Sequence, residues 1–369
     1  MTAAATTVRV NLRERSYDIT IGTHVLADAG AVTLARGPVS HCVLITDENV
    51  QPRHAQTVAD SLAEAGINVD LLVVPAGEES KSIEVANELW QAMLAAGTDR
   101  KSWVVAVGGG VIGDLAGFMA ATYARGLSFL QVPTTLLADV DSSVGGKVGV
   151  NLPGAKNMVG AFWQPAAVLI DTQALTTLPE REYLSGLAEI VKYGMILDAD
   201  FLSYLEAHAN EILAREPASL TKIIARSCEL KAAVVEQDER EETGLRAVLN
   251  YGHTFAHAIE AVAGYGEYLH GEAVAIGMQC AARLAAALGR IPREVVDRQE
   301  RLLLALRLPV SVPKQLDEAA LLAAMQHDKK VEHGRLRFVL PTKIGHVELV
   351  GGIESKLVRE AFAPSLAVG

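Results

Sequence analysis

Three histidines occur close together in the second half of the chain, at spacings that suit a metal site. His253 and His257 lie four residues apart in the segment NYGHTFAH (250–257), and His270 follows in LHGE (269–272). Residues four apart share one face of a helix, and neutral imidazole is the commonest protein ligand of divalent transition metals. Histidines also occur as ordinary polar residues of a core or a surface, so the spacing alone leaves both interpretations open.

A carboxylate that can complete the ligand set lies earlier, in the segment LAEIVKYG (187–194). A helix there places Glu189 and Lys192 on one face, because residues three apart are neighbours. Glu189, His253 and His270 make three protein ligands, which leave one position open for substrate and favour a catalytic zinc. Such a metal polarises a hydroxyl or a carbonyl. His257 then serves either as a further ligand or as an acid–base group near the metal.

A glycine pattern in the first half of the chain indicates a nucleotide site. The segment GGGVIGD (108–114) has the spacing G-x-G-x-x-G and follows the apolar run 103–107. Between a strand and a helix, this pattern lets the backbone approach a pyrophosphate at the helix N-terminus. A tight turn that merely packs the helix on the strand would look the same. No acidic residue closes a strand about 20 residues downstream, so Asp47, after an earlier strand, is the candidate for a ribose contact. The loop 77–81 is a second candidate, with a solvated turn as its alternative.

Basic side chains suggest an anionic substrate, although each one alone is compatible with an ordinary surface charge. The loop DSSVGGK (141–147) lacks the spacing and the Ser or Thr of a P-loop, which argues against ATP binding in that manner. Arg125 and Arg246 lie beside glycines or among apolar residues, where a bare charge would be costly. Converging cations suit a substrate with a carboxylate and a phosphate. The cations in question are Arg125, Lys147, Lys156, Lys192, Lys231, Arg246 and the pair Lys329–Lys330.

Alternating β and α patterns indicate how the first half positions these residues. They predict a parallel sheet with helices on both faces, preceded by a β-hairpin. The hairpin is expected at 8–12 and 15–21, the buried strands at 42–46, 69–74, 103–107, 127–132 and 167–171, and the helices at 52–65, 82–96 and after the glycine turn.

From about residue 178 to residue 324 the periodicity is almost entirely helical, and a small strand pair is expected at 335–340 and 345–349. The stretch 273–288 predicts a buried helix. The predicted fold class is therefore α/β: a parallel-sheet nucleotide-binding domain, 1–177, and a mainly α-helical metal- and substrate-binding domain, 178–369. Closure between the two would help to exclude water.

The overall composition limits the classes of binding partner and the cellular compartment that we expect. Half of the 369 residues are apolar and the formal net charge is −11, which argues against nucleic acid or an anionic membrane as the main partner. Three cysteines without a CxxC pair favour a reducing, cytoplasmic setting. We expect no membrane span and no secretion signal, because the chain has no run of about 18 apolar residues and no apolar signal core near residue 1.

Together these segments resemble the 3-dehydroquinate synthase family, within the sugar-phosphate cyclases. The resemblance runs from Asp47 to the DKK segment (328–330), and GGGVIGD, PTT, DSSVGGK, LAEIVKYG, LNYGHTFAHAIE and LHGEAVAIGM are highly specific in combination. The iron-dependent alcohol dehydrogenase fold shares the pattern more distantly. The resemblance implies a homodimeric lyase that converts 3-deoxy-D-arabino-heptulosonate 7-phosphate to 3-dehydroquinate and phosphate, in the shikimate pathway of aromatic amino-acid biosynthesis. It implies transient oxidation by NAD, phosphate elimination, re-reduction and intramolecular aldol closure.

The resemblance also implies residue roles. Zinc, or alternatively cobalt, would be bound by Glu189, His253 and His270. NAD would be surrounded by Asp47, Asn49, Gly77, Glu78, Lys81, Gly109, Gly110, Val111, Ile112, Gly113, Asp114, Thr134, Thr135, Lys147, Lys156, Ala174, Leu175, Thr176 and Thr177. The substrate would contact Arg125, Asp141, Lys147, Lys156, Asn157, Lys192, Lys231, Arg246, Asn250, His257 and one of Lys329 or Lys330, with Lys330 favoured. We hypothesise that His257 and Lys147 handle protons or orient phosphate.

Three other functions fit part of the pattern. A sister cyclase would use heptulose 7-phosphate or glucose 6-phosphate, which lack the carboxylate. A polyol dehydrogenase of the same fold would accumulate NADH and would not need the cationic cluster. A non-catalytic regulator that binds NAD or a sugar phosphate would not need the complete set of metal ligands and cations.

Overall fold

The computed structural model describes residues 5–264, 266–326 and 336–363 and divides the chain into two compact units. Unit one contains residues 1–179 and 217–240, and unit two contains residues 180–216 and 241–369. The chain first passes from unit one to unit two between residues 179 and 180, close to the boundary expected at residue 178. Residues 217–240, however, belong to unit one, although the sequence analysis placed them in the helical domain.

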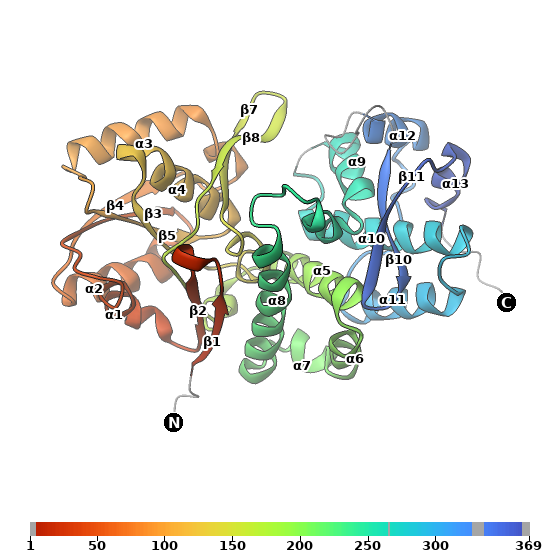
Figure 1. The fold of residues 1–369 in the computed structure, drawn as a ribbon, viewed down its shortest axis with the longest axis horizontal. Coiled ribbons are helices and arrows are strands. Elements are labelled where there is room, and N and C mark those ends of the chain that lie inside the picture. The colour runs from red at the N-terminus through yellow and green to blue at the C-terminus, as the bar shows by residue number, and fades with distance from the viewer. Residues whose placement is uncertain (1–4, 265, 327–335, 364–369) are drawn as a thin grey trace. The chain divides into compact units, whose positions relative to one another are not determined.

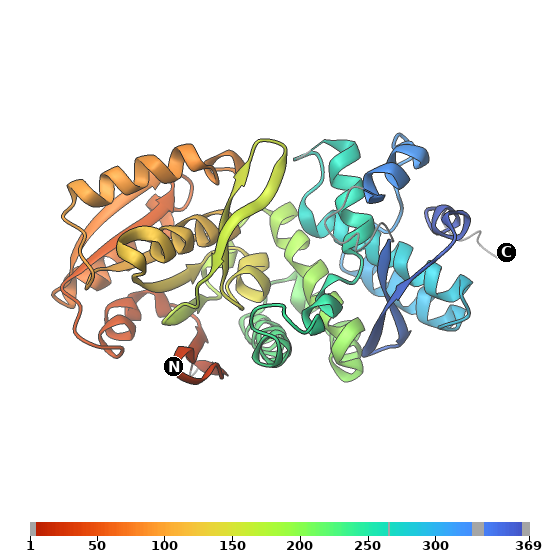
Figure 2. The same ribbon diagram turned by 45° about the horizontal axis from the view of Figure 1, so that its top comes forward.

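A seven-stranded sheet forms the centre of unit one (Figures 1 and 2). Its strands are hydrogen-bonded in the order β1-β2-β9-β6-β5-β3-β4. Neighbours from β2 to β4 are parallel, whereas β1 pairs antiparallel with β2. The expected hairpin is therefore the edge of the main sheet. The strands are β1 (Thr6–Val10), β2 (Tyr17–Gly22), β3 (His41–Asp47), β4 (Asn68–Val74), β5 (Trp103–Gly108), β6 (Ser128–Pro133) and β9 (Ala167–Asp171).

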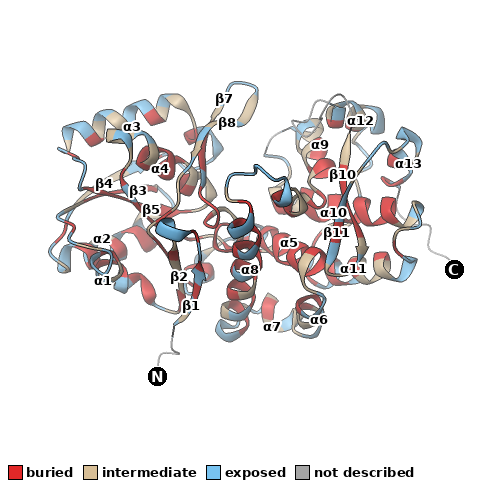
Figure 3. Ribbon diagram, viewed as in Figure 1, coloured by how far each residue is buried: buried red, intermediate tan, exposed pale blue. Residues whose placement is uncertain are grey.

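Successive side chains of the central strands build a core on each face of this sheet. Cys42 and Leu44 of β3 pack into the cluster that contains α1 and α2, whereas Val43 and Ile45 pack into the cluster that contains α3 and α4. Strands covered on both faces are expected to be continuous apolar runs, and Figure 3 shows the buried strands. These helices are α1 (Ala29–Leu34), α2 (Gln56–Glu64), α3 (Ile83–Ala95) and α4 (Gly110–Thr122).

Helix α8 (Pro217–Gln237) completes unit one by packing on β1 and on the π-helical turn η6 (Ala138–Ser142). Polar contacts reinforce this packing near the end of α8. The backbone N–H of Asn11 donates to the Glu236 carboxylate at 2.6 Å, and Arg15 pairs with Glu239 at 2.5 Å. The helical periodicity of α8 was predicted, but periodicity does not say which core a helix covers.

A second hairpin in unit one, β7 (Lys147–Leu152) with β8 (Ala155–Phe162), was not predicted. The sequence analysis described 141–147 as a glycine-rich loop that does not match a P-loop, and it predicted no strands between 133 and 166. In the structure, glycines instead let the two strands approach closely, since a Cβ on Gly160 would lie 2.2 Å from the Val148 carbonyl oxygen. The hairpin therefore begins at Lys147 and carries Lys156 and Asn157 on its second strand.

Unit two is mainly helical, as predicted, with one small antiparallel strand pair. Helix α10 is almost entirely buried, and glycines bring it close to its neighbours. A Cβ on Gly271 would lie 1.8 Å from the Ser185 carbonyl oxygen of α5. The elements are α5 (Glu180–Leu197), α6 (Ala199–Ala207), α7 (Ala209–Leu213), α9 (His253–Ala263), α10 (His270–Ala287), α11 (Arg293–Ala305), α12 (Glu318–Gln326), α13 (Ser355–Glu360), β10 (Arg337–Lys343) and β11 (His346–Gly351). Across the described residues, none of the helices has the length and apolar character needed to cross a membrane.

Candidate metal centre and nucleotide site

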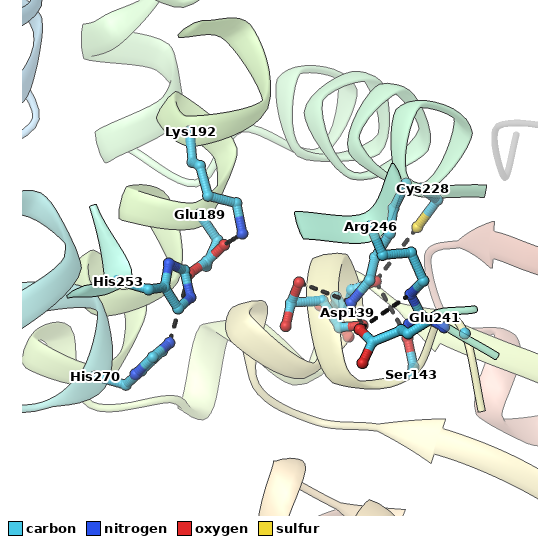
Figure 4. Close-up of polar contacts among 12 residues, drawn as sticks. Asp139, Ser143, Glu189, Lys192, Cys228, Glu241, Arg246, His253 and His270 are labelled. Atoms are coloured by element: carbon cyan, nitrogen blue, oxygen red, sulfur yellow. Dashed lines mark hydrogen bonds and ion pairs between the residues drawn. The ribbon is translucent and has the colours of Figure 1, made fainter. Parts of the chain in front are cut away.

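Glu189, His253 and His270 come together in unit two (Figure 4). Glu189 lies in the middle of α5, whereas His253 and His270 are the first residues of α9 and α10. Glu189 Oε1 lies 3.6 Å from His253 Nε2 and 3.5 Å from His270 Nε2. One ligand atom of each residue lies within 4.8 Å of the other two, and within the described part of the chain no other group of this kind occurs. The ligand set predicted from spacing is therefore assembled.

The other nitrogen of each imidazole has an acceptor, which fixes the direction of the ring. His253 Nδ1 lies 3.2 Å from the Tyr251 carbonyl oxygen, and His270 Nδ1 lies 3.4 Å from Glu260 Oε1. Carbonyl and carboxylate oxygens only accept, so each Nδ1 carries a proton and each Nε2 can offer its lone pair to a cation. Glu260 was not identified from the sequence, although it lies seven residues after His253 on the same face of α9.

The charges around these ligands are buried and paired. Glu189 is fully buried, and its second oxygen forms an ion pair with Lys192, which is 2% exposed. Burial lowers the pKa of His270, but hydrogen bonds with Glu189 and Glu260 outweigh that effect and raise it to about 10. Two imidazole nitrogens and one carboxylate oxygen match the donors that zinc and cobalt prefer, so these residues fit such a cation.

His257 lies outside the three-residue group. Its ring centroid is 5.7 Å from that of His253, with the two rings nearly perpendicular. Its side chain is not among the three whose ligand atoms come together.

Apart from Lys147 and Lys156 on the β7–β8 hairpin, the predicted nucleotide residues lie at or after the ends of strands of the parallel sheet in unit one. Chain order reverses between β3 and β5, because β4 continues on one side and β6 and β9 on the other. In open α/β sheets, ligands bind outside the carboxyl ends of strands at such a switch point. Asp47 ends β3 and Asn49 follows it, the residues 77–81 follow β4, the glycine turn follows β5, Thr134 and Thr135 follow β6, and the turn 174–177 follows β9.

Different glycines of the turn have different roles. Gly109 is the N-cap of α4 and makes no side-chain cap, so the first N–H groups of this helix are available to an anion. Gly113 packs against β6, since a Cβ there would lie 2.5 Å from Gln131 Nε2. The packing and anion-binding interpretations of the motif therefore apply to different glycines. A Cβ on Gly109 would lie 3.0 Å from Thr135 and one on Gly110 would lie 3.2 Å from Ser142, so both positions at the start of the helix are tight.

Side-chain contacts connect the loop after β4 to α4 and to the β7–β8 hairpin. Lys81 Nζ pairs with Asp114 Oδ2 at 2.5 Å, and Asn151 donates to Glu78 Oε1 at 2.7 Å. Asn151 Oδ1 accepts the backbone N–H of Asn157 at 2.8 Å. Burial raises the pKa of Asp114, and the charge of Lys81 only partly offsets this. Asn151 was not identified from the sequence, because a single asparagine within a strand gives no functional signal.

The predicted substrate residues divide between the units. Lys231 on α8 donates to the Asp141 carboxylate at 2.7 Å and to its carbonyl at 2.6 Å, which brings these two together. Arg246 is buried, as its apolar neighbours suggested, but Arg125 is exposed, contrary to that expectation. Arg125 lies in a left-handed turn (φ 70°) before Gly126, where the chain stays at the surface. Unit one holds Arg125, Asp141, Lys147, Lys156, Asn157 and Lys231, unit two holds Lys192, Arg246, Asn250 and His257, and Lys329 and Lys330 lie outside the described residues.

Two further residues near these sites were missed. His54 is buried beside the turn after β9, with Nε2 2.8 Å from Thr177 Oγ1. Asp139, two residues before Asp141, is fully buried, and neither carboxylate oxygen has a hydrogen-bond partner among the described residues. Burial, with a smaller contribution from Asp171, raises the pKa of Asp139 well above its ordinary value. Figure 4 shows Asp139 beside Cys228, whose thiol donates to the Asp139 carbonyl.

Comparisons with known proteins agree with this architecture. The family model described as 3-dehydroquinate synthase N-terminal matches residues 71–185, and the model described as 3-dehydroquinate synthase C-terminal matches residues 186–331. A protein of Rhodopirellula baltica named 3-dehydroquinate synthase is 52% identical over 368 residues, which cover 98% of each chain.

Solved structures with the same architecture include two sugar-phosphate cyclases. A 2-deoxy-scyllo-inosose synthase, complexed with carbaglucose-6-phosphate, NAD+ and Co2+, aligns with a TM-score of 0.89 and 29% identity over 97% of this chain and 99% of its own. The 2-epi-5-epi-valiolone synthase of Streptomyces hygroscopicus subsp. jinggangensis 5008, with NAD+ and Zn2+ bound, aligns with a TM-score of 0.86 and 30% identity over 95% and 97%. The full-length match, the matching family models and the assembled Glu-His-His group lead to one conclusion: the chain belongs to the 3-dehydroquinate synthase family.

Proposed function

We propose that this chain is a carbon–oxygen lyase that converts 3-deoxy-D-arabino-heptulosonate 7-phosphate to 3-dehydroquinate and phosphate. The observation that carries the proposal is the group Glu189, His253 and His270, with both Nε2 atoms directed at one carboxylate oxygen. A relative named 3-dehydroquinate synthase is 52% identical to this chain, which supports the choice of substrate. The solved 2-deoxy-scyllo-inosose synthase and 2-epi-5-epi-valiolone synthase are more distant in sequence, at 29% and 30% identity.

In this proposal the three ligands hold zinc, with cobalt as an alternative. When bound, zinc and NAD would together supply the polarisation of the substrate hydroxyl and the reversible hydride acceptor that the reaction requires. The chain's own contribution is to present two Nε2 lone pairs and one carboxylate oxygen around a single point. Lys192 pairs with the other oxygen of Glu189 and so keeps this carboxylate ionised and oriented.

NAD binding is proposed at the carboxyl ends of the strands in unit one. The uncapped first turn of α4 would receive the pyrophosphate, and Asp47, held by the N–H groups of Asn49 and Val50, would face a ribose. The turn 174–177, which His54 contacts through Thr177, would form another part of the same wall. Lys147 and Lys156 would contact NAD as well as substrate.

The cations supply binding energy for a doubly anionic substrate. Lys231, already oriented by Asp141, and buried Arg246 are preformed donors for the phosphate and the carboxylate. Arg125, Lys147, Lys156, Asn157, Lys192, Asn250 and Lys330 complete the proposed set. His257, beside the metal ligands, is the proposed proton-handling residue.

The deciding experiment measures phosphate release from 3-deoxy-D-arabino-heptulosonate 7-phosphate, with zinc present and NAD at a substoichiometric level. Many turnovers per NAD, with 3-dehydroquinate as product and no net NADH, are expected. Release of phosphate only from a heptulose 7-phosphate without the carboxylate would assign the chain to a sister cyclase reaction. Net NADH formation without phosphate loss would indicate a dehydrogenase.

We also propose that the chain works as a homodimer in the cytoplasm. Three buried, unpaired cysteines suit a reducing compartment. The second strand of the β7–β8 hairpin carries the exposed apolar side chains Met158 and Phe162, which suit burial against a second copy. A monomeric mass by light scattering at micromolar concentration would contradict the dimer.

A further inference from the structure

A chain of buried hydrogen bonds runs through unit two behind the metal ligands. Tyr251 is fully buried, and its hydroxyl lies 2.7 Å from Gln299 Oε1 and 3.1 Å from the Met278 carbonyl oxygen. Gln299 donates to Gln279 Oε1 at 3.0 Å, and Gln279 donates to Glu300 Oε2 at 3.0 Å. Both glutamines are also fully buried. We call the residues Tyr251, Gln299 and Gln279 the buried relay.

The direction of every hydrogen bond in the buried relay is determined from its outer end. Glu300 presents a carboxylate, which only accepts, so Gln279 must direct its amide NH2 toward it. The oxygen of Gln279 then accepts from the NH2 of Gln299, and the oxygen of Gln299 accepts the single proton of the Tyr251 hydroxyl. Buried polar groups are costly when unpaired, so a fully satisfied chain strongly favours this one arrangement.

The other end of Tyr251 is the acceptor of a metal ligand. Its carbonyl oxygen accepts the Nδ1 proton of His253, while Gly252 between them adopts a left-handed conformation (φ 81°). A Cβ on Gly252 would lie 2.6 Å from the Met278 nitrogen, and one on Gly277 would lie 2.2 Å from the Gly252 oxygen. The turn 251–252 therefore lies directly on α10, with no space in which to shift.

His253 depends on this turn for its orientation. It is the first residue of α9, and its N-cap, Gly252, has no side chain that could cap the helix. The backbone N–H groups of a first turn have no partners within the helix, so the helix itself holds the position of His253 only weakly. The hydrogen bond from its Nδ1 to the Tyr251 carbonyl orients the imidazole on the side opposite to Glu189.

We infer that the buried relay is a positioning device for the metal ligand His253. It fixes the Tyr251 ring from α10 and α11, the ring fixes the carbonyl, and the carbonyl holds the imidazole with Nε2 toward Glu189. The inference rests on the proposed metal site, but it concerns residues that touch neither metal nor substrate. Tyr251 and Gln299 are therefore positioning residues.

The test is Tyr251→Phe, measured by chelator competition for zinc and by the absorption spectrum of the cobalt-loaded protein. Partners in the outer shell of a metal typically contribute about 10–100-fold to affinity, and we expect a loss of about 10-fold for this indirect contact. The cobalt spectrum should change, because a reoriented imidazole alters the geometry around the ion. Neither readout responds to a simple loss of stability if the protein is folded.

Tyr183→Phe is the matched control. Tyr183 is also a buried tyrosine of unit two, and its hydroxyl donates to the Ile212 carbonyl at 2.6 Å, away from His253. It should lower the melting temperature to a similar extent while leaving zinc affinity and the cobalt spectrum unchanged. An equal loss of affinity in both variants would overturn the inference, because the effect would then be one of general stability.

Gln299→Met tests the buried relay at its middle residue and serves if Tyr251→Phe does not fold. It should weaken zinc binding in the same direction, and the double variant should cost no more than the larger single change, because both act through one chain. Zinc affinities within about twofold of wild type in the folded variants would reject the buried relay. Failure of the wild-type chain to bind one zinc would instead reject the metal site itself.

Discussion

At the scale of single residues, Glu189 combines two roles that are difficult to separate. One oxygen faces both histidines, and the other forms an ion pair with Lys192 at full burial. An ionised carboxylate is tolerated at such a position only when opposite charge compensates it on each side. Lys192 supplies part of that charge, and protonated His270 or a bound cation supplies the rest.

Glu189→Gln removes the ligand charge while keeping the side-chain volume. We expect it to abolish stoichiometric zinc binding, because a neutral amide is a poor ligand and leaves Lys192 unpaired. Equilibrium dialysis followed by metal analysis measures this. Glu260→Gln is the control, since an amide oxygen can still accept from His270 Nδ1, and it should keep one zinc per chain with a loss of roughly 10-fold in affinity. One zinc per chain in the Glu189 variant would show that the ligand set is wrong.

Asp139 predicts a pH effect on stability. Burial raises its folded-state pKa, so the folded chain keeps a proton that the unfolded chain releases above its ordinary pKa near 3.8. The folded state then binds more protons than the unfolded state, and stability falls as pH rises from about 4 toward neutrality. Asp139→Asn removes this titration. Urea titrations at pH 5 and pH 8 give the free energy of unfolding of the variant minus that of wild type. This difference should be more positive at pH 8, because only wild type loses stability as pH rises. A difference that is independent of pH would contradict the raised pKa.

At the scale of elements, the metal centre depends on the close approach of α5 and α10. Glu189 and His270 lie on different helices, and the distance between them is set where Gly271 contacts the Ser185 carbonyl. The backbone N–H of Gly271 also donates a hydrogen bond to Ser185 Oγ at 3.0 Å, which joins the two helices at the same point. The absence of a side chain at residue 271 therefore permits the helix approach that brings Glu189 and His270 together.

Gly271→Ala should force the two helices apart, because its Cβ would lie 1.8 Å from a backbone oxygen. We expect a destabilisation of about 1–3 kcal/mol, typical of overpacking, together with weaker zinc binding. Gly194→Ala on α5 is the control, since its Cβ would lie 3.1 Å from Leu202 and can be accommodated with a small shift. Thermal unfolding and chelator competition measure both. Unchanged zinc affinity in a folded Gly271 variant would separate helix spacing from metal binding.

Much of this arrangement follows from the sequence. Runs such as CVLIT and WVVAV predict strands covered on both faces. The set Glu189, His253 and His270 proposed from the sequence is the group that the structure assembles, whereas the spacing alone left His257 open as a further ligand. The β7–β8 hairpin was missed because Gly149 and Gly160, which there permit close strand approach, are elsewhere typical of loops. Tyr251 and Gln299 lie 48 positions apart in the chain. Their hydrogen bond depends on tertiary packing, which local patterns do not report.

At the scale of the whole molecule, the two proposed ligands belong to different units. The predicted NAD residues lie in unit one, and the metal ligands lie in unit two. A ligand that binds only the folded state stabilises the part of the structure that forms its site. Each ligand should therefore slow backbone amide hydrogen exchange only in the unit that binds it.

Hydrogen exchange measured by mass spectrometry checks this prediction. Zinc alone should slow exchange in α5 and at the starts of α9 and α10, whereas NAD alone should slow exchange in the glycine turn and the first turn of α4. The Glu189→Gln variant should lose the zinc response and keep the NAD response. Protection of the glycine turn by zinc alone would show that the units are coupled before substrate binds.

The assignment of α8 to unit one also has a consequence for biosynthesis. The ribosome releases residues 180–216, which belong to unit two, before it releases the helix that covers β1. Until residue 240 has emerged, the nascent chain lacks the partners of Asn11 and Arg15, so its first unit is incomplete while the second has already begun. A gene fragment that stops at residue 179 would therefore encode a sheet without one of its covering helices.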